Sequence, residues 1–491
     1  MKLFNLRGGV HPEGHKALSA LHVIRELPLP KHLYLSLQQH IGAPAAPVVQ
    51  VGDRVLKGQV IATAQGNVSA AIHAPTSGTI TALGDWASPH PSGLTAPTMT
   101  LASDGKEQWI ETPTVADPFA LAPADIAARV GAAGIVGLGG ATFPAALKLN
   151  LSRNSGVQTL IMNGGECEPY LTCDNLIMRE RAAQVIEGIR LIALAVEAKT
   201  VLVGIEDNKP DAIAAMQQAA KGTSVKVVSM PSMYPMGSEK QIIQVLTGNE
   251  IPAGGRPADI GVLVHNVATA YAVQQAIRLG RPLISRIITV SGGALNQPCN
   301  VEALIGTPVQ ELIDFAGGYH LPATRLVLGG PMMGQQFTNT QVPVLKGTSG
   351  VLALTASEVG QAEASPCIRC ATCVRACPVG LLPLEMAAHI RVSDLTGAVE
   401  LGLRDCIACG SCSYVCPAHI PLVHYFNYAK GDLAAQERSK LKQESTKKLA
   451  EARTERIARI ERARAEAAAK RKAAREAKER AAAAKLATEA A

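Results

Sequence analysis

The sequence predicts a multidomain α/β protein that ends in a cysteine-rich helical domain and a charged helix. Three observations support this fold class. Short β-branched segments alternate with helical segments over the first 355 residues, two runs of four cysteines follow, and everything after Gly431 lacks proline and glycine. A chain of 491 residues is long enough for about three to four domains.

The two cysteine runs share the spacing C-x2-C-x2-C-x3-C-P, which holds two [4Fe–4S] clusters in bacterial ferredoxins. In such folds the fourth cysteine of each run binds the other cluster. We therefore assign Cys367, Cys370, Cys373 and Cys416 to one cluster, and Cys406, Cys409, Cys412 and Cys377 to the other. Zinc is the alternative metal, because C-x2-C pairs also bind zinc. The doubled, proline-ended pattern of four ligands favours the iron–sulfur clusters and predicts electron transfer.

Composition and charge narrow the class of protein further. Apolar segments are interrupted by charges and the first residues lack a signal core, so we expect neither a membrane span nor export. Eight of the eleven cysteines lie in the two runs, which suits a reducing compartment, and we expect Cys167, Cys173 and Cys299 to be ordinary thiols. The net charge of +7 resides in the tail, because residues 437–491 hold 17 Lys and Arg against 9 Asp and Glu.

The N-terminal part begins with a Gly-Gly-Val-His-Pro loop at Gly8–Pro12, to which the residue types assign no chemistry. Short β segments then follow at Val48–Val55, Gly58–Ala62 and Ile72–Ile80. Their order resembles a biotinyl/lipoyl-type barrel-sandwich module. The carrier lysine of such modules is absent, since Gly66-Asn67-Val68-Ser69 stands at the hairpin, so we expect a docking or packing module.

The middle of the chain has an α/β rhythm. A helix predicted over residues 123–133 leads into the glycine-rich stretch Gly134–Lys148. Strands predicted at 158–162, 200–205, 225–230 and 261–264 each run into polar residues. Ligands of open α/β sheets bind at the carboxyl ends of the strands, and glycine-rich backbone accommodates phosphate. The sequence therefore predicts a nucleotide or phosphate site here, with a tight turn as the alternative for the glycines.

Four motifs in this region make a family resemblance specific. They are Gly-Gly-Ala-x-Phe-Pro, Asn-x-x-Glu-x-Glu-Pro, Tyr-x-x-Gly-x-Glu and Asn-Val-x-Thr, in this order and before the cysteine runs. The arrangement resembles the NADH-binding flavoprotein subunit of respiratory complex I and, more closely, the C subunit of the Rnf (Rsx) electron-transport complex, over about residues 1–430. A related subunit of the sodium-pumping NADH:quinone reductase lacks the two clusters, so the cysteine runs argue against it.

The resemblance implies a set of cofactor-binding residues. For non-covalent FMN it implies Gly137, Gly139, Gly140, Lys148, Asn163, Gly165, Glu166, Asn266 and Thr269. For NADH it implies stacking near Phe143, with Glu168 and Glu239 near the ribose or nicotinamide. The chain departs from the complex I pattern at Leu138, Thr142 and Ser238, where Arg, Gly and Glu are expected.

The resemblance also implies a function and a location. It implies a NADH-oxidising electron-entry subunit of an ion-translocating complex, peripheral on the cytoplasmic side of a bacterial inner membrane. Electrons would pass from NADH through FMN to the two clusters, then to or from a ferredoxin-type carrier and membrane subunits. A flavin fits this chemistry because NADH gives two electrons whereas a cluster accepts one. The alternatives are a non-catalytic iron–sulfur relay or scaffold, or part of a system that reduces a redox-sensing transcription factor.

Six segments are expected: an N-terminal segment (1–30), a barrel-sandwich hybrid (31–115), a Rossmann-like FMN- and NADH-binding domain (116–280), a β-grasp (SLBB) module (281–355), a two-cluster ferredoxin domain (356–430) and a helical tail (431–491). The tail is rich in Ala, Lys, Arg and Glu, without a sustained heptad pattern. We expect either a solvated helix or one that adheres to an anionic membrane surface. Nucleic-acid binding has no aromatic or fold signal to support it.

Overall fold

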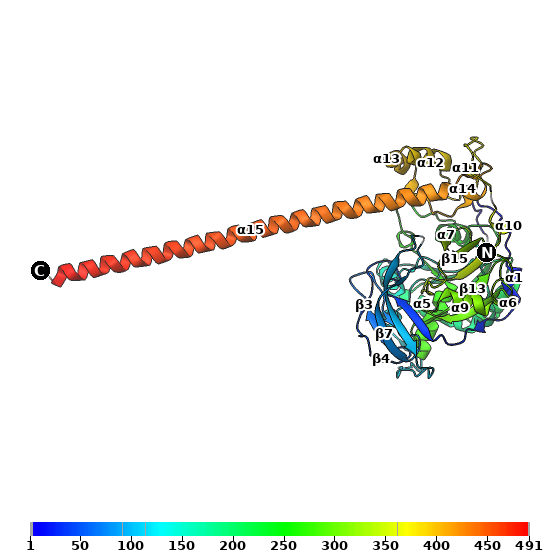
Figure 1. The fold of residues 1–491 in the computed structure, drawn as a ribbon, viewed down its shortest axis with the longest axis horizontal. Helices are drawn as coiled ribbons and strands as arrows, with labels where there is room; N and C mark the ends of the chain where they lie inside the picture. Colours follow the sequence, from blue (N-terminus) through cyan, green and yellow to red (C-terminus); the bar gives the residue numbers. More distant parts are fainter. Residues whose placement is uncertain (1–2, 91, 113, 361, 490–491) are drawn as a thin grey trace. The chain divides into compact units, whose positions relative to one another are not determined.

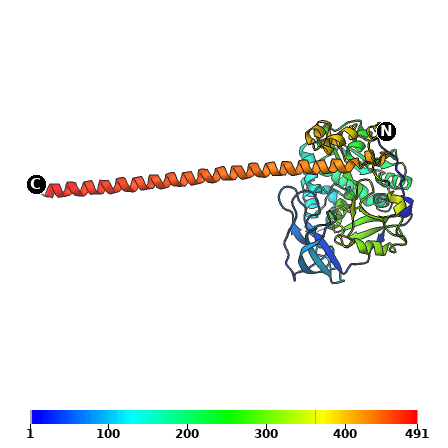
Figure 2. The same cartoon turned by 45° about the horizontal axis from the view of Figure 1, so that its top comes forward.

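The computed structural model describes residues 3–90, 92–112, 114–360 and 362–489 (Figure 1). Residues up to Val423 form one compact unit, and residues from His424 onward form a second. The first unit contains four layered modules that follow one another along the chain (Figure 2).

The N-terminal module consists of two small sheets. One sheet has the antiparallel order β2 (His32–Ser36), β8 (Thr95–Ser103), β7 (Gly78–Ala87), β4 (Arg54–Val55), and the other has the order β3 (Ala46–Pro47), β5 (Val60–Thr63), β6 (Ile72–His73). Their inward side chains, among them Leu33, Leu35, Ile61 and Met99, are fully buried. This two-sheet core is the arrangement expected for a barrel-sandwich module.

The α/β domain is built on a parallel sheet. Its order is β11 (Val225–Met230), β10 (Thr200–Glu206), β9 (Thr159–Gly164), β12 (Val262–Asn266). Side chains alternate across β9: Leu160 and Met162 pack among α2 (Pro123–Ala132), α5 (Ala182–Val196) and α8 (Val267–Leu279), whereas Ile161 packs against α7 (Glu239–Thr247). Helices therefore cover both faces, and polar groups gather at the strand ends. Further helices are α3 (Ala145–Asn154), α4 (Cys173–Glu180) and α6 (Pro210–Ala220).

The following module is a six-stranded mixed sheet. Its order is β1 (Arg25–Glu26), β14 (Cys299–Leu304), β13 (Ser285–Ser291), β17 (Gly350–Leu354), β15 (Arg325–Leu328), β16 (Gln335–Phe337). Helix α9 (Val309–Phe315) buries Leu312 and Ile313 in the same core. Strand β1 comes from the N-terminal segment and pairs with β14, so the N-terminal segment forms part of this six-stranded sheet.

The cysteine-rich module is helical. It contains α11 (Thr372–Ala376), α12 (Pro383–Arg391), α13 (Leu395–Glu400) and α14 (Ser411–Tyr414). Helix α15 spans Leu422–Glu489 and holds the tail; it begins about nine residues before the expected start of the tail. Within the described residues, none of the helices combines the length and the apolar character needed to cross a bilayer.

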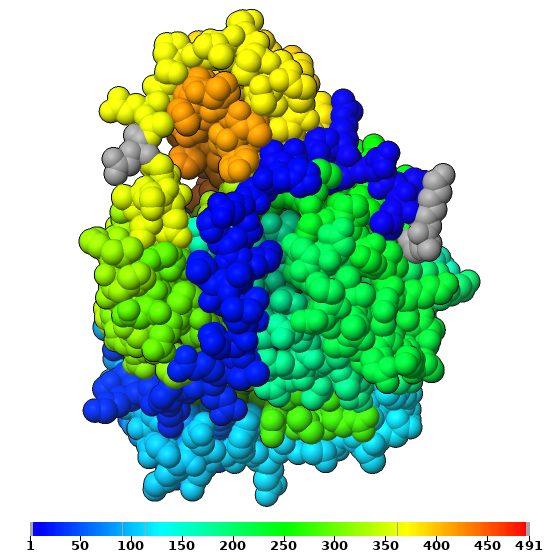
Figure 3. All heavy atoms as spheres, turned by 90° about the vertical axis from the view of Figure 1, so that its right-hand side faces the viewer, coloured from blue at the N-terminus to red at the C-terminus, as the bar shows by residue number. Residues whose placement is uncertain are grey.

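The N-terminal segment lies across the surface of the α/β domain and reaches the cysteine-rich module (Figure 3). The Gly9 amide donates to the Ala376 carbonyl at 3.0 Å, and Val10 exchanges two backbone hydrogen bonds with Tyr234. A Cβ atom on Gly8 would overlap the Cys377 backbone, so glycine is needed for this approach. The Gly8–Pro12 loop, to which its residue types assigned no role, therefore joins two modules.

Candidate functional site

A cavity of about 820 Å³ opens at the carboxyl ends of β9 and β12. Its walls come from the α/β domain, residues 38–41 of the barrel-sandwich module, residues 328–349 of the six-stranded module, and Ile407 of the cysteine-rich module. Cofactor sites commonly have volumes of roughly 300–1,000 Å³. Eight of the twelve residues predicted to bind FMN or NADH line it: Gly139, Gly140, Asn163, Gly165, Glu166, Glu168, Glu239 and Asn266.

The other four predicted residues do not line the cavity: Gly137, Phe143, Lys148 and Thr269. The Gly137 amide donates to the Phe143 carbonyl at 2.8 Å, which closes the glycine-rich loop. The Leu138 amide donates to the Thr269 hydroxyl at 3.0 Å. Lys148 Nζ donates to Glu239 at 2.9 Å and to the Val264 carbonyl at 2.7 Å. These residues shape and orient the lining.

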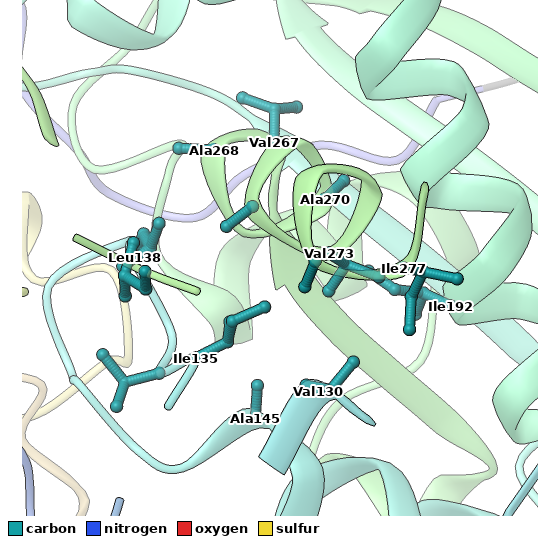
Figure 4. Close-up of a cluster of buried hydrophobic side chains, with 14 of the residues drawn as sticks. Val130, Ile135, Leu138, Ala145, Ile192, Val267, Ala268, Ala270, Val273 and Ile277 are labelled. Atoms are coloured by element: carbon teal, nitrogen blue, oxygen red, sulfur yellow. The ribbon is translucent and has the colours of Figure 1, made fainter. Parts of the chain in front are cut away.

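The glycine-rich loop is anchored by Leu138, the residue that stands where complex I has Arg. Its side chain is buried in a cluster that includes Ile135 and, from α8, Val267 (Figure 4). The neighbouring Gly139 leaves only 3.1 Å between a hypothetical Cβ and that of Asn266, so a larger residue would press on Asn266. Thr142, in place of the expected Gly, adopts a left-handed φ of 49°, a conformation that glycine would adopt without strain.

The floor of the cavity carries an unpaired carboxylate oxygen. Glu166 is 6% exposed, and its Oε1 accepts the Asp174 amide at 2.8 Å, whereas Oε2 has no hydrogen-bond partner among the described residues. Asp174 accepts from Asn266 Nδ2 at 2.6 Å, and burial together with Glu166 raises the pKa of Asp174 to about 7. A buried acceptor without a donor is costly. The hydroxyl and N–H groups of FMN are suitable donors, so the residues fit this cofactor.

Glu168, predicted near NADH, is tied to the six-stranded module. Its carboxylate accepts the amides of Met332 and Met333 at 3.0 and 2.9 Å. Burial raises its pKa to about 7, although these two amides and Lys16 favour the charged form. Glu168 thus fixes the loop that forms one wall of the cavity, while still contributing to its lining.

The raised pKa of Glu168 predicts a pH-dependent contribution to stability. Because its folded pKa lies above the unfolded value of 4.5, its contribution is present below that value and is lost as pH rises through about 7. We expect the unfolding free energy of wild type, relative to Glu168→Gln, to fall by about 3 kcal/mol between about pH 5 and pH 8. Denaturant titrations at the two pH values measure this; a constant difference would contradict it.

Lys16, which no sequence motif selects, supports the turn that carries Glu166 and Glu168. Its Nζ donates to the carbonyls of Glu166 (2.7 Å), Glu168 (3.0 Å) and Leu171 (2.7 Å). Burial lowers the pKa of this lysine, and the nearby Glu166 opposes the shift. One cation therefore satisfies three main-chain acceptors beneath the cavity.

We expect Lys16→Met to reduce the unfolding free energy by about 3 kcal/mol, because the Glu168 and Leu171 carbonyls lose their donor and the Glu166 carbonyl keeps only a 3.4 Å contact from Lys209 Nζ. Denaturant titration measures the change, and Lys199→Met, at an exposed lysine, serves as the matched control. A loss equal to that of the control would show that the three contacts are energetically unimportant.

The two cysteine runs adopt the same backbone conformation. Arg369 and Ala408, at equivalent positions, have φ values of 53° and 55°. Their amides donate to Cys367 Sγ and Cys406 Sγ, each at 3.4 Å. The backbone thus curls in the same way around each group of sulfurs, as two equivalent sites require. Among the described residues, no three His, Cys, Asp or Glu side chains converge in the way that a single metal ion needs.

Thiols of one run lie close to thiols of the other. Burial first, then Cys409, Cys406 and Cys377, raise the pKa of Cys412 to about 12. Burial also raises the pKa of Cys373, to which Cys416 contributes. The fourth cysteine of each run therefore lies near the thiols of the other run. We call Cys377, Cys406, Cys409 and Cys412 the inner set, and Cys367, Cys370, Cys373 and Cys416 the outer set.

The two sets differ in burial and in contact with the cavity wall. Three thiols of the inner set are buried and none of the outer set is, while Cys367 and Cys370 are exposed. Tyr234 lines the cavity and its hydroxyl donates to the Cys409 carbonyl at 2.6 Å. Ile407, between two inner ligands, is itself part of the cavity wall. The cavity and the inner set therefore share a wall.

Sequence reasoning did not select three residues that build this site: Lys16, Asp174 and Tyr234. Tyr234 heads the Tyr-x-x-Gly-x-Glu motif, which was a usable signal. Asp174 follows Cys173 at the start of α4, and Lys16 lies in a segment with no motif. Both act through contacts with residues far away in the chain, and no local pattern signals those.

Family models match four consecutive regions of the chain. They are described as RnfC barrel sandwich hybrid domain (residues 4–106), Nuo51 FMN-binding domain (130–275), SLBB domain (287–336) and 4Fe-4S dicluster domain (361–438). They confirm the predicted fold class, in the predicted order. The predicted FMN and [4Fe–4S] cofactors are likewise confirmed by the kinds of domain present.

Curated relatives extend over most of the chain. The C subunit of the ion-translocating oxidoreductase complex of Rhodobacter capsulatus is 52% identical over 90% of this chain and 85% of its own length. The Pseudomonas aeruginosa protein of the same name is 47% identical over 90% of this chain and 58% of its own. The C subunit of the proton-translocating ferredoxin:NAD(+) oxidoreductase complex of Clostridium ljungdahlii is 44% identical over 90% and 96%. The chain therefore belongs to the family of C subunits of the Rnf-type ion-translocating oxidoreductase complexes.

Proposed function

We propose that this chain is the electron-entry subunit at which NADH is oxidised, and that electrons leave through the inner set and then the outer set of cysteines. The observation that carries the proposal is the wall shared by the flavin cavity and the inner set, formed by Tyr234 and Ile407. Bound FMN would supply the conversion between a two-electron hydride donor and one-electron acceptors. The protein supplies position, hydrogen bonds and exclusion of water.

Each part of the lining has a distinct task in this proposal. The glycine-rich loop leaves room for the cofactor near Gly139 and Gly140, and Glu166 Oε2 accepts one of its donors. Glu239 is 42% exposed and held by Lys148, so it stands near the cavity opening, where a dinucleotide can reach it. We infer that Glu239 contacts NADH, and that Glu168 serves the wall more than the nucleotide.

The exposed cysteines of the outer set indicate where a redox partner could dock. Cys367 and Cys370 are exposed, and Ile368 between them is 68% exposed. A redox partner that docks there could exchange electrons with the outer cluster, whereas the inner set is covered. We propose a ferredoxin-type carrier or another subunit of the complex as this partner, with the chain attached peripherally to the cytoplasmic side of a bacterial inner membrane. Electron flow in the reverse direction would use the same residues.

Anaerobic titration of the purified, cluster-loaded chain with NADH tests the proposal. We expect FMN to be retained, its absorbance to bleach on addition of NADH, and both clusters to become reduced afterwards. A chain that contains both clusters but neither retains flavin nor responds to NADH would be the non-catalytic relay, and the proposal would fail.

A further inference from the structure

Helix α15 carries a segregated charge pattern that its overall composition conceals. Successive residues of an α-helix are separated by about 100° around its axis, so residues 7, 11 or 18 positions apart lie almost in line. Lys442, Leu449, Ile460, Lys478 and Lys485 are spaced in this way and form one stripe. We define the basic half as the half-cylinder centred on this stripe, over residues 437–487, and the acidic half as the remainder.

The two halves differ sharply in charge. The basic half holds 11 Lys and Arg, if Arg459 on its edge is included, and no Asp or Glu, whereas the acidic half holds all eight Glu and six Lys and Arg. The net charges are therefore +11 and −2. A helix stabilised in water by ion pairs alone would mix both signs around its surface.

The large apolar side chains follow the basic half as well. Residues 437–487 contain five of them: Leu449, Ile457 and Ile460 lie within the basic half, and Leu441 and Leu486 lie on its two opposite edges. Each is at least 45% exposed. They are too sparse for a coiled-coil seam, which needs apolar residues at every a and d position. A basic face opposite an acidic face is complementary in charge to an anionic bilayer surface, and the aliphatic residues on it are too few to anchor the helix by themselves.

We propose that the basic half of α15 binds the anionic lipid surface of the membrane. Residues 437–487 form a helix about 75 Å long, so the basic half can lie along a flat membrane surface over its whole length. The aliphatic side chains would enter the boundary between headgroups and acyl chains, and the acidic half would face water. Nucleic acid is a poorer fit, because no aromatic residue follows Tyr428 and aliphatic residues interrupt the basic face. The chain's peripheral attachment to the membrane was proposed above, and the basic half of α15 is the surface that would make this contact. The evidence for it comes from the charge pattern of α15 alone.

Two matched variants of the chain distinguish the effect of the basic half from the effect of the total charge. The first replaces Lys442, Arg456, Arg464, Lys470 and Lys478, all on the basic half, with Gln. The second replaces Lys447, Lys448, Arg462, Lys472 and Arg480, all on the acidic half, with Gln. Each removes three lysines and two arginines, and Gln preserves helix propensity. Circular dichroism checks that both retain the helix.

Flotation with vesicles of phosphatidylglycerol mixed with phosphatidylcholine is the readout. We expect the wild type to bind these vesicles and not phosphatidylcholine alone, and binding to weaken as salt is raised. The basic-half variant should bind about a hundredfold more weakly, and the acidic-half variant no more than about threefold. NADH reduction of the flavin should be unchanged in both, so a failure here is distinguishable from a failure of the redox proposal.

Tryptophan fluorescence tests whether the aliphatic residues insert into the bilayer. In the Ile460→Trp variant, on the basic half, the tryptophan emission should shift to shorter wavelength when the chain binds these vesicles. In the Ala465→Trp variant, on the acidic half, it should not shift. The proposal is overturned if both Gln variants lose equal affinity, if binding does not require anionic lipid, or if duplex DNA at the same salt displaces the vesicles.

Discussion

Replacing Cys409 with alanine is expected to interrupt electron transfer between the flavin and the outer cluster. Cys409 belongs to the buried inner set, and its carbonyl accepts the hydroxyl of Tyr234 from the wall of the flavin cavity. We expect the iron content to fall by about half, because one of two four-iron clusters loses a ligand. NADH should still bleach the flavin, while reduction of the outer cluster falls to background.

The matched control for this variant is Cys370→Ala, at an exposed ligand of the outer set. It should lose a similar amount of iron, yet NADH should still reduce the remaining inner cluster. Iron analysis with EPR spectroscopy after anaerobic NADH addition distinguishes the two variants. Reduction of the outer cluster at the wild-type rate in Cys409→Ala would contradict the proposed order.

Glu166→Gln should weaken FMN binding by about thirtyfold, or roughly 2 kcal/mol. The substitution can keep one oxygen for the Asp174 amide, but the second oxygen, which has no partner within the described residues, becomes an NH2 group. A donor on the cofactor would then meet a donor on the protein. Fluorescence titration of the flavin-free chain measures the affinity.

Glu111→Gln, at an exposed glutamate outside the cavity, controls for loss of a charge. The Asp174 amide contact predicts little change in unfolding free energy for Glu166→Gln, so a separate loss of stability would point to a structural role. Unchanged FMN affinity would mean that Glu166 Oε2 does not face the cofactor.

Much of the fold follows from local patterns that act over a few residues. The strands β9 to β12 were predicted within two residues of their observed bounds, because apolar runs that end in polar or turn residues mark strands of a parallel sheet. The equivalent curl of the two cysteine runs also follows from spacing, since the ligand positions fix the backbone. The tail helix was predictable from its composition, although it begins earlier, at Leu422.

The assembly of the site was less accessible from sequence. Lys16 reaches three carbonyls about 150 residues away, and strand β1 pairs with β14 across a larger separation, Arg25 with Val301. No periodicity encodes which distant element a lone lysine or a two-residue strand will meet. For Lys148, which the resemblance places near the flavin, the structure adds contacts with Glu239 and the Val264 carbonyl that the sequence did not indicate.

The shared wall between the flavin cavity and the inner set is tested most directly by the order in which the centres of the intact chain are reduced. Rapid mixing with NADH under anaerobic conditions, followed by freeze-quenching and EPR spectroscopy, resolves this order once Cys370→Ala has identified the inner-cluster signal. We predict that flavin reduction comes first, the inner-cluster signal next, and the outer-cluster signal last. An outer-cluster signal that precedes the inner one would contradict it.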